Sequence, residues 1–555
     1  MTTAKNKKIW WTISLTVFVL LLVVIVSLNY WAKARVRQEL EQLSGRKLNG
    51  IYTLSFGKTY VDIWSGEFQA TEISLQSDTA VWNKLRAQQP DSLPALVSLT
   101  AQTIHIKHFN LLRYFSGKTA AMRSVVLDNP QLTIISTRDT VKADVSLKDR
   151  LLKLPESISS FASSLKIKHI SVNNASVHLR TIRAPGDTLK QDLEQADLYV
   201  KDLNTENGSN EVTYCKEIEI RARHIATIFN VGTQKISFDD FKMSKNGKHV
   251  SLHNFQVDPQ RSEQQFFKDI GVRKAYFTIK SPEITLEGFD LNRWLTNDYL
   301  YAHSMHVQEP MLHFTINKFL PLPFRKLLPH ELVAKVKGVF NVEELIVKDG
   351  QIAITNRVDG KDFSITFDHS YITANNFTND SLLMDDSHPL AIWAEARFMD
   401  QAPVKLQLNL PLRSRTLDAD YTASVDGLSL AVLNPVISHK HLSITSGYMR
   451  SAEIKSVIRN GVATGKVVMQ YQGLEIELMK KDTGKTRKLA SKIANILINE
   501  DNTKADPSTF ITGNISLTRN KQEEFFAFMW HSIQTGLMET ILPAYEKLNM
   551  KPGRT

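Results

Sequence analysis

The sequence predicts a mostly β protein that begins with a transmembrane helix and carries only short helices elsewhere, including an amphipathic helix near its C-terminus. An uncharged apolar stretch near the N-terminus predicts the membrane segment. Short runs of alternating apolar and polar residues fill most of the remaining chain, and this period of two is typical of strands. One pattern of apolar positions recurs along these runs, which favours a repetitive sheet.

We predict a cytoplasmic tail over residues 1–8 and a transmembrane helix over residues 9–31. The stretch from Ile9 to Tyr30 carries no charge and can cross about 30 Å of hydrocarbon at about 1.5 Å per residue. Aromatic residues, which favour the membrane interfaces, stand at both ends: Trp10, Trp11, Tyr30 and Trp31. A cleaved signal peptide is the alternative, although its apolar core would be only about 7–15 residues long. We expect the large C-terminal part to lie outside the cytoplasm.

Charge and cysteine content narrow the classes of partner. The chain holds 68 Lys and Arg against 57 Asp and Glu, a formal net charge of +11, which favours anionic partners. Its basic residues are spread along the predicted strands rather than interleaved with aromatics on one face, so nucleic acid is not expected. Cys215 is the only cysteine, so a large apolar core, not a disulfide, must stabilise the fold.

The recurring pattern has two alternating apolar positions, a doubled polar step, and two more alternating apolar positions. The doubled step would move the second pair to the opposite face of the sheet. A bulge at that step is the simplest way to keep all four side chains on one surface, so we predict one in each copy. The larger apolar side chains of the pattern are Phe68, Ile73, Leu75, Ile104, Ile106, Phe109, Leu111, Leu165, Ile167, Ile170, Val172, Val250, Leu252, Phe255, Val257, Ile284, Leu286, Phe289, Leu291, Phe340, Val342, Leu345 and Val347.

The spacing of the copies indicates a duplication. Residues 101–134 align without a gap on residues 281–314, at an offset of 180. The identical pairs are Ile104/Ile284, Phe109/Phe289, Leu111/Leu291, Arg113/Arg293, Ser124/Ser304, Pro130/Pro310 and Leu132/Leu312. We predict a helical connector (32–53), two β units (54–240 and 241–400), a C-terminal β region (401–520) with a basic helical insert (480–500), and a final amphipathic helix and tail (521–555).

Turn-forming pairs of residues occur along the alternating runs. They are Asn173–Asn174, Asn246–Gly247, Asp349–Gly350 and Asp359–Gly360. Such pairs adopt the left-handed backbone that tight hairpins require. We therefore predict hairpin turns at these positions and antiparallel meanders between them.

Few helices are predicted after the connector. Short candidates lie at Leu112–Phe115, Leu151–Ser164 and Arg325–Lys335. In the basic insert, Lys485, Arg487, Lys488 and Lys492 either form a solvated face or contact anionic lipid headgroups. The apolar helix from Glu524 to Leu542 either caps the last strands or docks onto a membrane or partner.

No motif predicts catalysis, a cofactor or a metal. The Gly-Lys-Thr tripeptides at Gly57, Gly117 and Gly484 lack the first glycine of a phosphate loop. The pairs His253 and Asp258, His303 and His306, and His330 and Glu331 lack further catalytic or ligand residues at suitable spacing. We expect a protein that is not an enzyme.

Several segments carry a resemblance to a known family. The run I-x-I-x-x-F-x-L-x-R-Y-F that ends in Phe115, the segment MRSVVLDNPQLTI from Met122 to Ile134, and the N-terminal anchor together resemble the AsmA-like proteins of Gram-negative envelopes. The segment from Leu165 to Leu179 resembles the same element again. This resemblance implies an elongated, twisted antiparallel β-sheet gutter with an apolar lining, anchored in the inner membrane with its bulk in the periplasm. It also implies a role in outer-membrane biogenesis, in which the groove binds, conducts or regulates phospholipids.

The resemblance makes the apolar positions of the recurring pattern the candidate lining of a lipid groove. A sheet face lined by Ile, Leu, Val and Phe offers acyl chains a dry path without any catalytic residue. The expected partners are a phospholipid or other acyl lipid, the membrane, and envelope proteins at the C-terminal end. The alternative is an envelope scaffold or assembly factor with an ordinary closed β core and no lipid path. Whether the apolar face is covered by protein separates the two.

Overall fold

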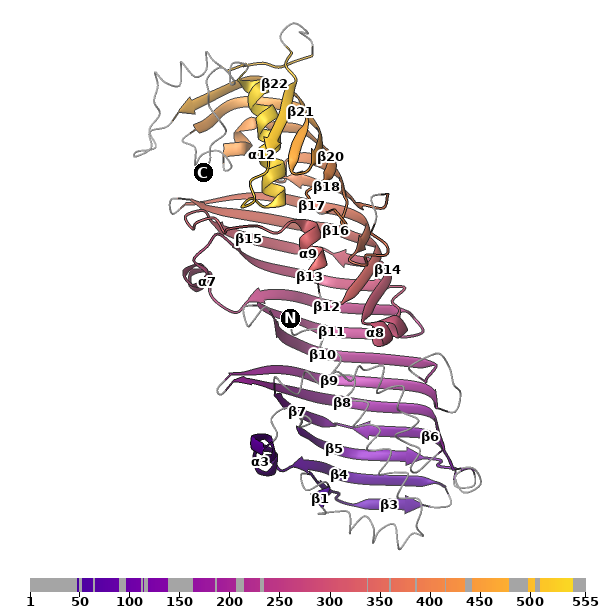
Figure 1. Cartoon of the computed structure of the whole chain (residues 1–555). Helices are drawn as coiled ribbons and strands as arrows, with labels where there is room; N and C mark the ends of the chain where they lie inside the picture. The colour runs from indigo at the N-terminus through magenta and orange to yellow at the C-terminus, as the bar shows by residue number, and fades with distance from the viewer. Residues whose placement is uncertain are drawn as a thin grey trace. The chain divides into compact units, whose positions relative to one another are not determined.

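The computed structural model describes residues 47–48, 52–62, 65–88, 96–110, 113, 118–137, 163–184, 187–205, 214–229, 234–336, 338–358, 361–384, 387–414, 416–434, 442–478, 498–504 and 510–542. Most of these residues lie in strands and few in short helices, which confirms the predicted fold class at that level (Figure 1). The chain divides into two compact units. The first comprises Met1–Gln260 with Glu283–Ala302, and the second comprises Arg261–Pro282 with His303–Thr555.

None of the helices in the described ranges combines the length and the apolar composition of a membrane span. The predicted tail (1–8) and transmembrane helix (9–31) lie outside those ranges and stay predictions. The predicted helical connector is wrong at its end, because Lys47–Leu48 (β1) and Tyr52–Ser55 (β2) form an antiparallel strand pair.

The first unit consists of a β-sheet and two short helices, α3 and α8. Its elements are β1, β2, β3 (Thr59–Asp62), β4 (Glu67–Ser77), α3 (Thr79–Gln88), β5 (Leu96–Lys107), β6 (Thr119–Asp128), β7 (Gln131–Thr137), β8 (Ser164–Ala184), β9 (Asp187–Asn204), β10 (Glu217–Phe229), β11 (Gln234–Ser244), β12 (His249–Pro259) and α8 (Leu291–Asn297). From β8 to β12 the pairs are antiparallel and follow chain order.

A break in the middle of this sheet makes it mixed rather than antiparallel. β6 and β7 lie end to end between β5 and β8, because β5 pairs antiparallel with both, through Thr103–Lys107 and Leu96–Thr100. β8 pairs with both in parallel. The prediction of a purely antiparallel sheet is therefore wrong: the two-residue gap between β6 and β7 does not reverse the chain, and β8 returns only after residues 138–162.

The second unit contains α7 (Glu263–Ile270), parts of β13 (Ala275–Glu287) and β14 (Tyr299–Gln308), and the elements that follow them. These are β15 (Met311–Asn317), α9 (Pro329–Ala334), β16 (Val339–Val358), β17 (Lys361–Thr378), β18 (Leu390–Phe398), β19 (Ala402–Leu410), β20 (Ala419–Ser429), η2 (Leu430–Leu433), β21 (Leu442–Arg459), β22 (Val462–Leu478), β23 (Gly513–Thr518) and α12 (Phe525–Ile541). β15 pairs antiparallel with β13 and parallel with β16, and the strands from β16 to β23 are antiparallel.

The two aligned segments of the sequence make the same main-chain hydrogen bonds. The N–H of Phe109 donates to Gly66 at 2.9 Å, and that of Phe289 donates to Lys248 at 2.8 Å. The side chains of Asn110 and Asp290 each accept a bond from the N–H three residues later, at 3.0 Å in both cases. The two segments therefore share local structure as well as sequence. The exact bounds of the predicted β units stay predictions.

Positive φ angles recur at one level across the strands of the first unit. They belong to Glu72 on β4, Asn129 between β6 and β7, Asn174 on β8, Gln195 on β9, His224 on β10 and Asn254 on β12, with φ from 48° to 52°. We call this row the crease. Side chains bridge it: Asn129 donates to Gln102 at 2.5 Å, Asn174 donates to Asn129 at 2.6 Å, and Asn254 donates to Asp239 at 3.0 Å.

The crease explains why apolar side chains stay on one face across a doubled polar step. On β4, Ala70 and Ile73 are both buried although Thr71 and Glu72 separate them. The predicted bulge is wrong at these steps, because the strand pairs keep their register across Glu72 and Asn254 without an extra residue. A left-handed residue at each of these two positions keeps the apolar side chains on one face instead. In β8 and β16 that residue lies on the opposite strand instead, at Asp202 and Asn376.

Two of the predicted hairpin turns are wrong. Asn173–Asn174 lies inside β8, and Asp349–Gly350 lies inside β16. Asn174 and Asp349 have φ of 51° and 54°, so they adopt the expected left-handed backbone but use it to kink a strand. Asn246–Gly247 does form a turn, and Asp359–Gly360 lies outside the described residues.

Each unit has its own apolar core. In the second unit α12 packs on the strands near it, with Phe525, Phe528 and Met529 buried in the same cluster as Tyr421 and Tyr471 (Figure 1). The hydroxyl groups of Tyr421 and Ser532 lie 2.9 Å apart. The predicted C-terminal helix is therefore confirmed as a helix, and it covers strands. Of the other predicted helices, Arg325–Lys335 contains α9, while Leu112–Phe115, Leu151–Ser164 and the insert 480–500 fall almost entirely outside the described residues.

Candidate functional site

The pattern positions of the first unit lie in a covered core. One apolar cluster there contains Phe68, Ile73, Leu75, Ile104, Ile106, Phe109, Leu165, Ile167, Ile170, Val250, Phe289 and Leu291. Val172 and Leu286 are partly buried against it. Val257 and Ile284 are also buried, Leu252 and Phe255 are partly exposed, and Leu111 lies outside the described residues. Most of these side chains are therefore not accessible in this structure.

In the second unit the pattern positions are less covered. Val342 is buried, whereas Phe340, Leu345 and Val347 on β16 are partly exposed. Leu345 packs against the core under α12. The two rings of Phe340 and Phe377 lie 5.0 Å apart.

A second set of side chains, which the pattern did not single out, forms a continuous apolar surface on four strands of the second unit. We call it the apolar wall: Phe277 and Ile279 on β13, Leu312 and Phe314 on β15, Ile352 and Ile354 on β16, and Ile365 and Phe367 on β17. The register of the strands places them in two adjacent rows across the sheet. The rows are Phe277–Phe314–Ile354–Ile365 and Ile279–Leu312–Ile352–Phe367. All eight are partly exposed. The alternation in residues 275–279, 312–316 and 352–354 could have identified them.

The opposite face of these strands is mostly polar, although Met311 and Ala353 also lie on it. It carries Thr278, His313, Thr355, Ser364 and Thr366. Thr355 and Ser364 are hydrogen-bonded to each other there at 2.8 Å. The wall is therefore the apolar side of a two-sided sheet.

The duplication provides an internal comparison for the wall. Leu312 and Phe314 align with Leu132 and Ile134 of β7, and Ile352 and Ile354 occupy the places of Val177 and Leu179 on β8. Leu132 and Ile134 are 5% and 1% exposed and belong to the core of the first unit. The wall residues belong to neither buried cluster. Equivalent positions are thus covered in one unit and accessible in the other.

Basic residues lie at one end of the wall. Arg273 and Lys274 precede β13, and Lys318 follows β15; because Ala275 pairs with Ile316, these residues are at the same end. The guanidinium of Arg273 donates to the carbonyls of Lys318 at 2.5 Å and Leu320 at 3.2 Å. We call Arg273, Lys274, Lys318 and Lys326 the cationic rim.

Burial and mutual repulsion act on the rim. Desolvation lowers the pKa of Lys318, and the neighbouring Arg273 lowers it further. Desolvation also lowers the pKa of Lys326, with repulsion from Lys274 and Arg273 acting in the same direction. Glu524 opposes these effects, and its own pKa is raised by desolvation. The Lys318 side chain still touches solvent, so it can meet a soluble or membrane anion.

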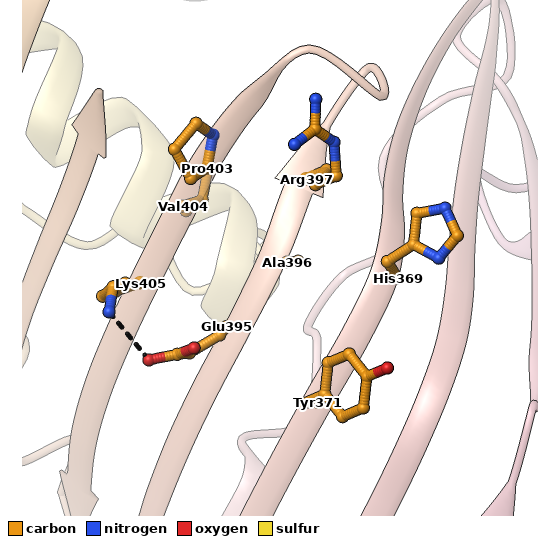
Figure 2. A pocket seen from close by; sticks show the side chains of 8 residues that line it. All are labelled: His369, Tyr371, Glu395, Ala396, Arg397, Pro403, Val404 and Lys405. Atoms are coloured by element: carbon orange, nitrogen blue, oxygen red, sulfur yellow. Dashed lines mark hydrogen bonds and ion pairs between the residues drawn. The ribbon is translucent and has the colours of Figure 1, made fainter. Parts of the chain in front are cut away.

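An open hollow occurs on the polar face of β17, β18 and β19. It is lined by His369, Tyr371, Glu395, Ala396, Arg397, Pro403, Val404 and Lys405, as Figure 2 shows. Lys405 is paired with Glu395 at 2.9 Å, and His369 with Asp349 at 2.7 Å. The hollow presents ion pairs and an exposed tyrosine, and no arrangement of nucleophile and base.

Three histidines of the candidate motifs each lie near a single polar side chain. His253 lies 3.8 Å from Glu283, His303 lies 2.8 Å from Glu343, and His306 lies 3.2 Å from Ser304. Across the described ranges, no group of three or more His, Cys, Asp or Glu side chains could hold a metal ion. The headgroup candidates Lys485, Arg487, Lys488 and Lys492 lie outside those ranges and stay a prediction.

Comparison with family models and with curated proteins gives no match to this chain. The function of the site must therefore be inferred from the residues that form it.

Proposed function

We propose that the apolar wall binds acyl chains of phospholipids. The proposal includes a wider role, in which an inner-membrane-anchored periplasmic protein conducts or regulates phospholipids in outer-membrane biogenesis, as the AsmA-like resemblance implies. The observation that carries it is the internal comparison: Phe314 and Ile354 are accessible, while their equivalents Ile134 and Leu179 are covered.

The physical reason is the cost of leaving such a surface in water. Contiguous exposed apolar surface is uncommon on soluble proteins and marks places where another molecule binds. Each methylene group that leaves water contributes about 0.8 kcal/mol, so an acyl chain gains several kcal/mol from such a surface without any polar contact. All eight side chains of the apolar wall are Phe, Ile or Leu, so the wall presents no polar side chain to a bound acyl chain.

The second candidate is the scaffold with a closed β core. The packed cluster of the first unit favours it, because Ile73, Ile106 and Ile167 are each 1% exposed. A lipid path over those positions would require the cover to move. The lipid proposal is therefore placed on the wall of the second unit rather than on the pattern positions of the first.

Site-specific crosslinking in cells tests the proposal. A photo-crosslinking amino acid at Phe314 should give phospholipid adducts that mass spectrometry can detect. The same amino acid at His313, next to it on the polar face, and at Ile134, the covered equivalent, provides matched controls. Adducts that are as abundant from His313 as from Phe314, or absent from Phe314, would favour the scaffold.

A further inference from the structure

The cationic rim lies at one end of the strands that carry the apolar wall. Main-chain bonds hold its parts at the end of the strands: Lys318 donates to the carbonyl of Arg357 at 3.0 Å, and Arg273 donates to that of Pro321 at 2.8 Å. Lys326 donates from its N–H to the carbonyl of Lys521 at 3.0 Å, which ties the loop after β15 to the segment before α12. The backbone positions of Arg273, Lys318 and Lys326 are thus fixed by main-chain bonds.

The charge balance at the rim favours an anion. Arg273 and Lys326 repel Lys318, and Lys274 and Arg273 repel Lys326. Of the carboxylates, Glu524 attracts both lysines and Glu523 attracts Lys318. In the part of the chain that the structure describes, neither Lys318 nor Lys326 forms an ion pair with a carboxylate within 4.0 Å. Clustered cations that repel one another are stabilised when an anion joins them.

Apolar side chains flank the rim as well. Phe319 follows Lys318 directly and is 61% exposed, and Phe324, two residues before Lys326, is 94% exposed. Exposed aromatic rings next to lysines are typical of surfaces that meet the headgroup region of a membrane. The rim therefore combines the features that an anionic amphiphile needs.

We infer that the second unit selects phospholipids with a net negative headgroup, with the headgroup held by the cationic rim and the acyl chains on the apolar wall. This inference rests on the proposed function. It adds to it a preference for one headgroup charge and names Lys318 and Lys326 as residues that determine specificity.

The test uses the full-length protein with the photo-crosslinking amino acid at Phe314. The purified protein is mixed with vesicles of phosphatidylglycerol or of phosphatidylcholine that have the same acyl chains, and the adducts are quantified. We expect the wild-type rim to give several times more adduct with phosphatidylglycerol. K318Q/K326Q should lower the phosphatidylglycerol yield by about 25-fold, since each lysine near an anionic lipid surface contributes about fivefold in binding.

A matched control separates the rim from the overall positive charge of the chain. Lys455 and Lys466 are exposed and face each other on β21 and β22, so K455Q/K466Q removes the same charge elsewhere in the second unit. This variant should keep the preference. Equal yields with the two lipids in the wild type, or equal losses in the two double variants, would overturn the inference while leaving lipid binding intact. No adduct with either lipid would overturn the proposed function itself.

Discussion

Asn129 and Glu309 occupy the same place in two copies of one strand arrangement. Each has a positive φ, each precedes a proline that separates two strands lying end to end, and each donates its N–H to the neighbouring parallel strand. The acceptors are the carbonyls of Asn173 at 2.9 Å and Lys348 at 2.8 Å. The carbonyl of the following proline accepts in both copies, from Ser176 at 2.8 Å and from Gln351 at 2.7 Å. The duplication therefore preserved a backbone geometry although the residue at its centre changed.

The crease should be sensitive to β-branched residues. Replacing Asn174, at φ 51°, with valine should lower the free energy of unfolding by about 1–2 kcal/mol, because a branched side chain is strained in the left-handed region. N174G also removes the asparagine side chain, but glycine adopts a positive φ without strain. The stability of N174G should therefore be closer to that of the wild type. Urea denaturation of the two variants measures the difference. Equal losses would show that the side-chain bonds of Asn174, not its backbone, matter.

The pKa of the exposed His369 should depend on its neighbour Asp349. The hydrogen bond from His369 to Asp349, at 2.7 Å, raises the pKa of the imidazole above its ordinary value of 6.5. A raised pKa means that the pair stabilises the fold at low pH, and that this contribution is lost as the pH rises through the pKa of the folded protein.

NMR titration of labelled histidine measures this pKa. D349N should lower the pKa of His369, whereas D362N, which removes a carboxylate paired with Arg357, should leave it unchanged. An unchanged pKa in D349N would show that the pair does not persist in solution.

The contact between α12 and β23 should depend on two glycines. A methyl group at Gly513 would meet the main-chain oxygen of Gly536, and one at Gly536 would meet Val467 at 2.6 Å. We expect G513A to lower the free energy of unfolding by about 1–3 kcal/mol, as overpacking usually does.

The same contact offers a compensating variant. G536A should be destabilising alone but close to neutral in combination with V467A, because the smaller side chain makes room and alanine favours the helix by about 1 kcal/mol. A G536A protein that is as stable as the wild type would contradict the close packing of α12.

Charge at equivalent positions should distinguish the covered face from the accessible one. I134D buries a carboxylate in the core of the first unit and should lower the free energy of unfolding by at least about 3 kcal/mol. F314D places it on the wall, where water can reach it, and should cost less than half as much. Thermal unfolding of the two purified variants compares them. Similar losses would mean that the wall is as closed as the core.

The sequence predicts which face of each strand is apolar but not what lies over that face. Leu132 and Leu312 are the same residue within the same aligned segment, yet one is 5% exposed and the other belongs to the accessible wall. The alternation of apolar and polar residues is a property of the strand itself, whereas the burial of its apolar face depends on segments that are distant in the sequence. The wall was therefore missed, although its alternation was visible.

Turn signals were ambiguous for a physical reason. Asn, Asp and Gly reach the left-handed backbone at low cost, and both a hairpin and a kinked strand use it. Asn246–Gly247 reverses the chain, whereas Asn174 kinks a strand that continues. The parallel pairs of β8 and β16 were missed because no local pattern records which strand a distant segment joins.

The crease also limits how this protein can change in length. Glu72, Asn174 and Asn254 lie at the same level on different strands of the first unit. Inserting or deleting one residue within a strand near the crease would shift the rest of that strand by one residue, which would turn its apolar side chains to the solvent face. Additions at the hairpin tips disturb no such match. Related chains are expected to vary at the tips of their strands while keeping the spacing around these kinks constant.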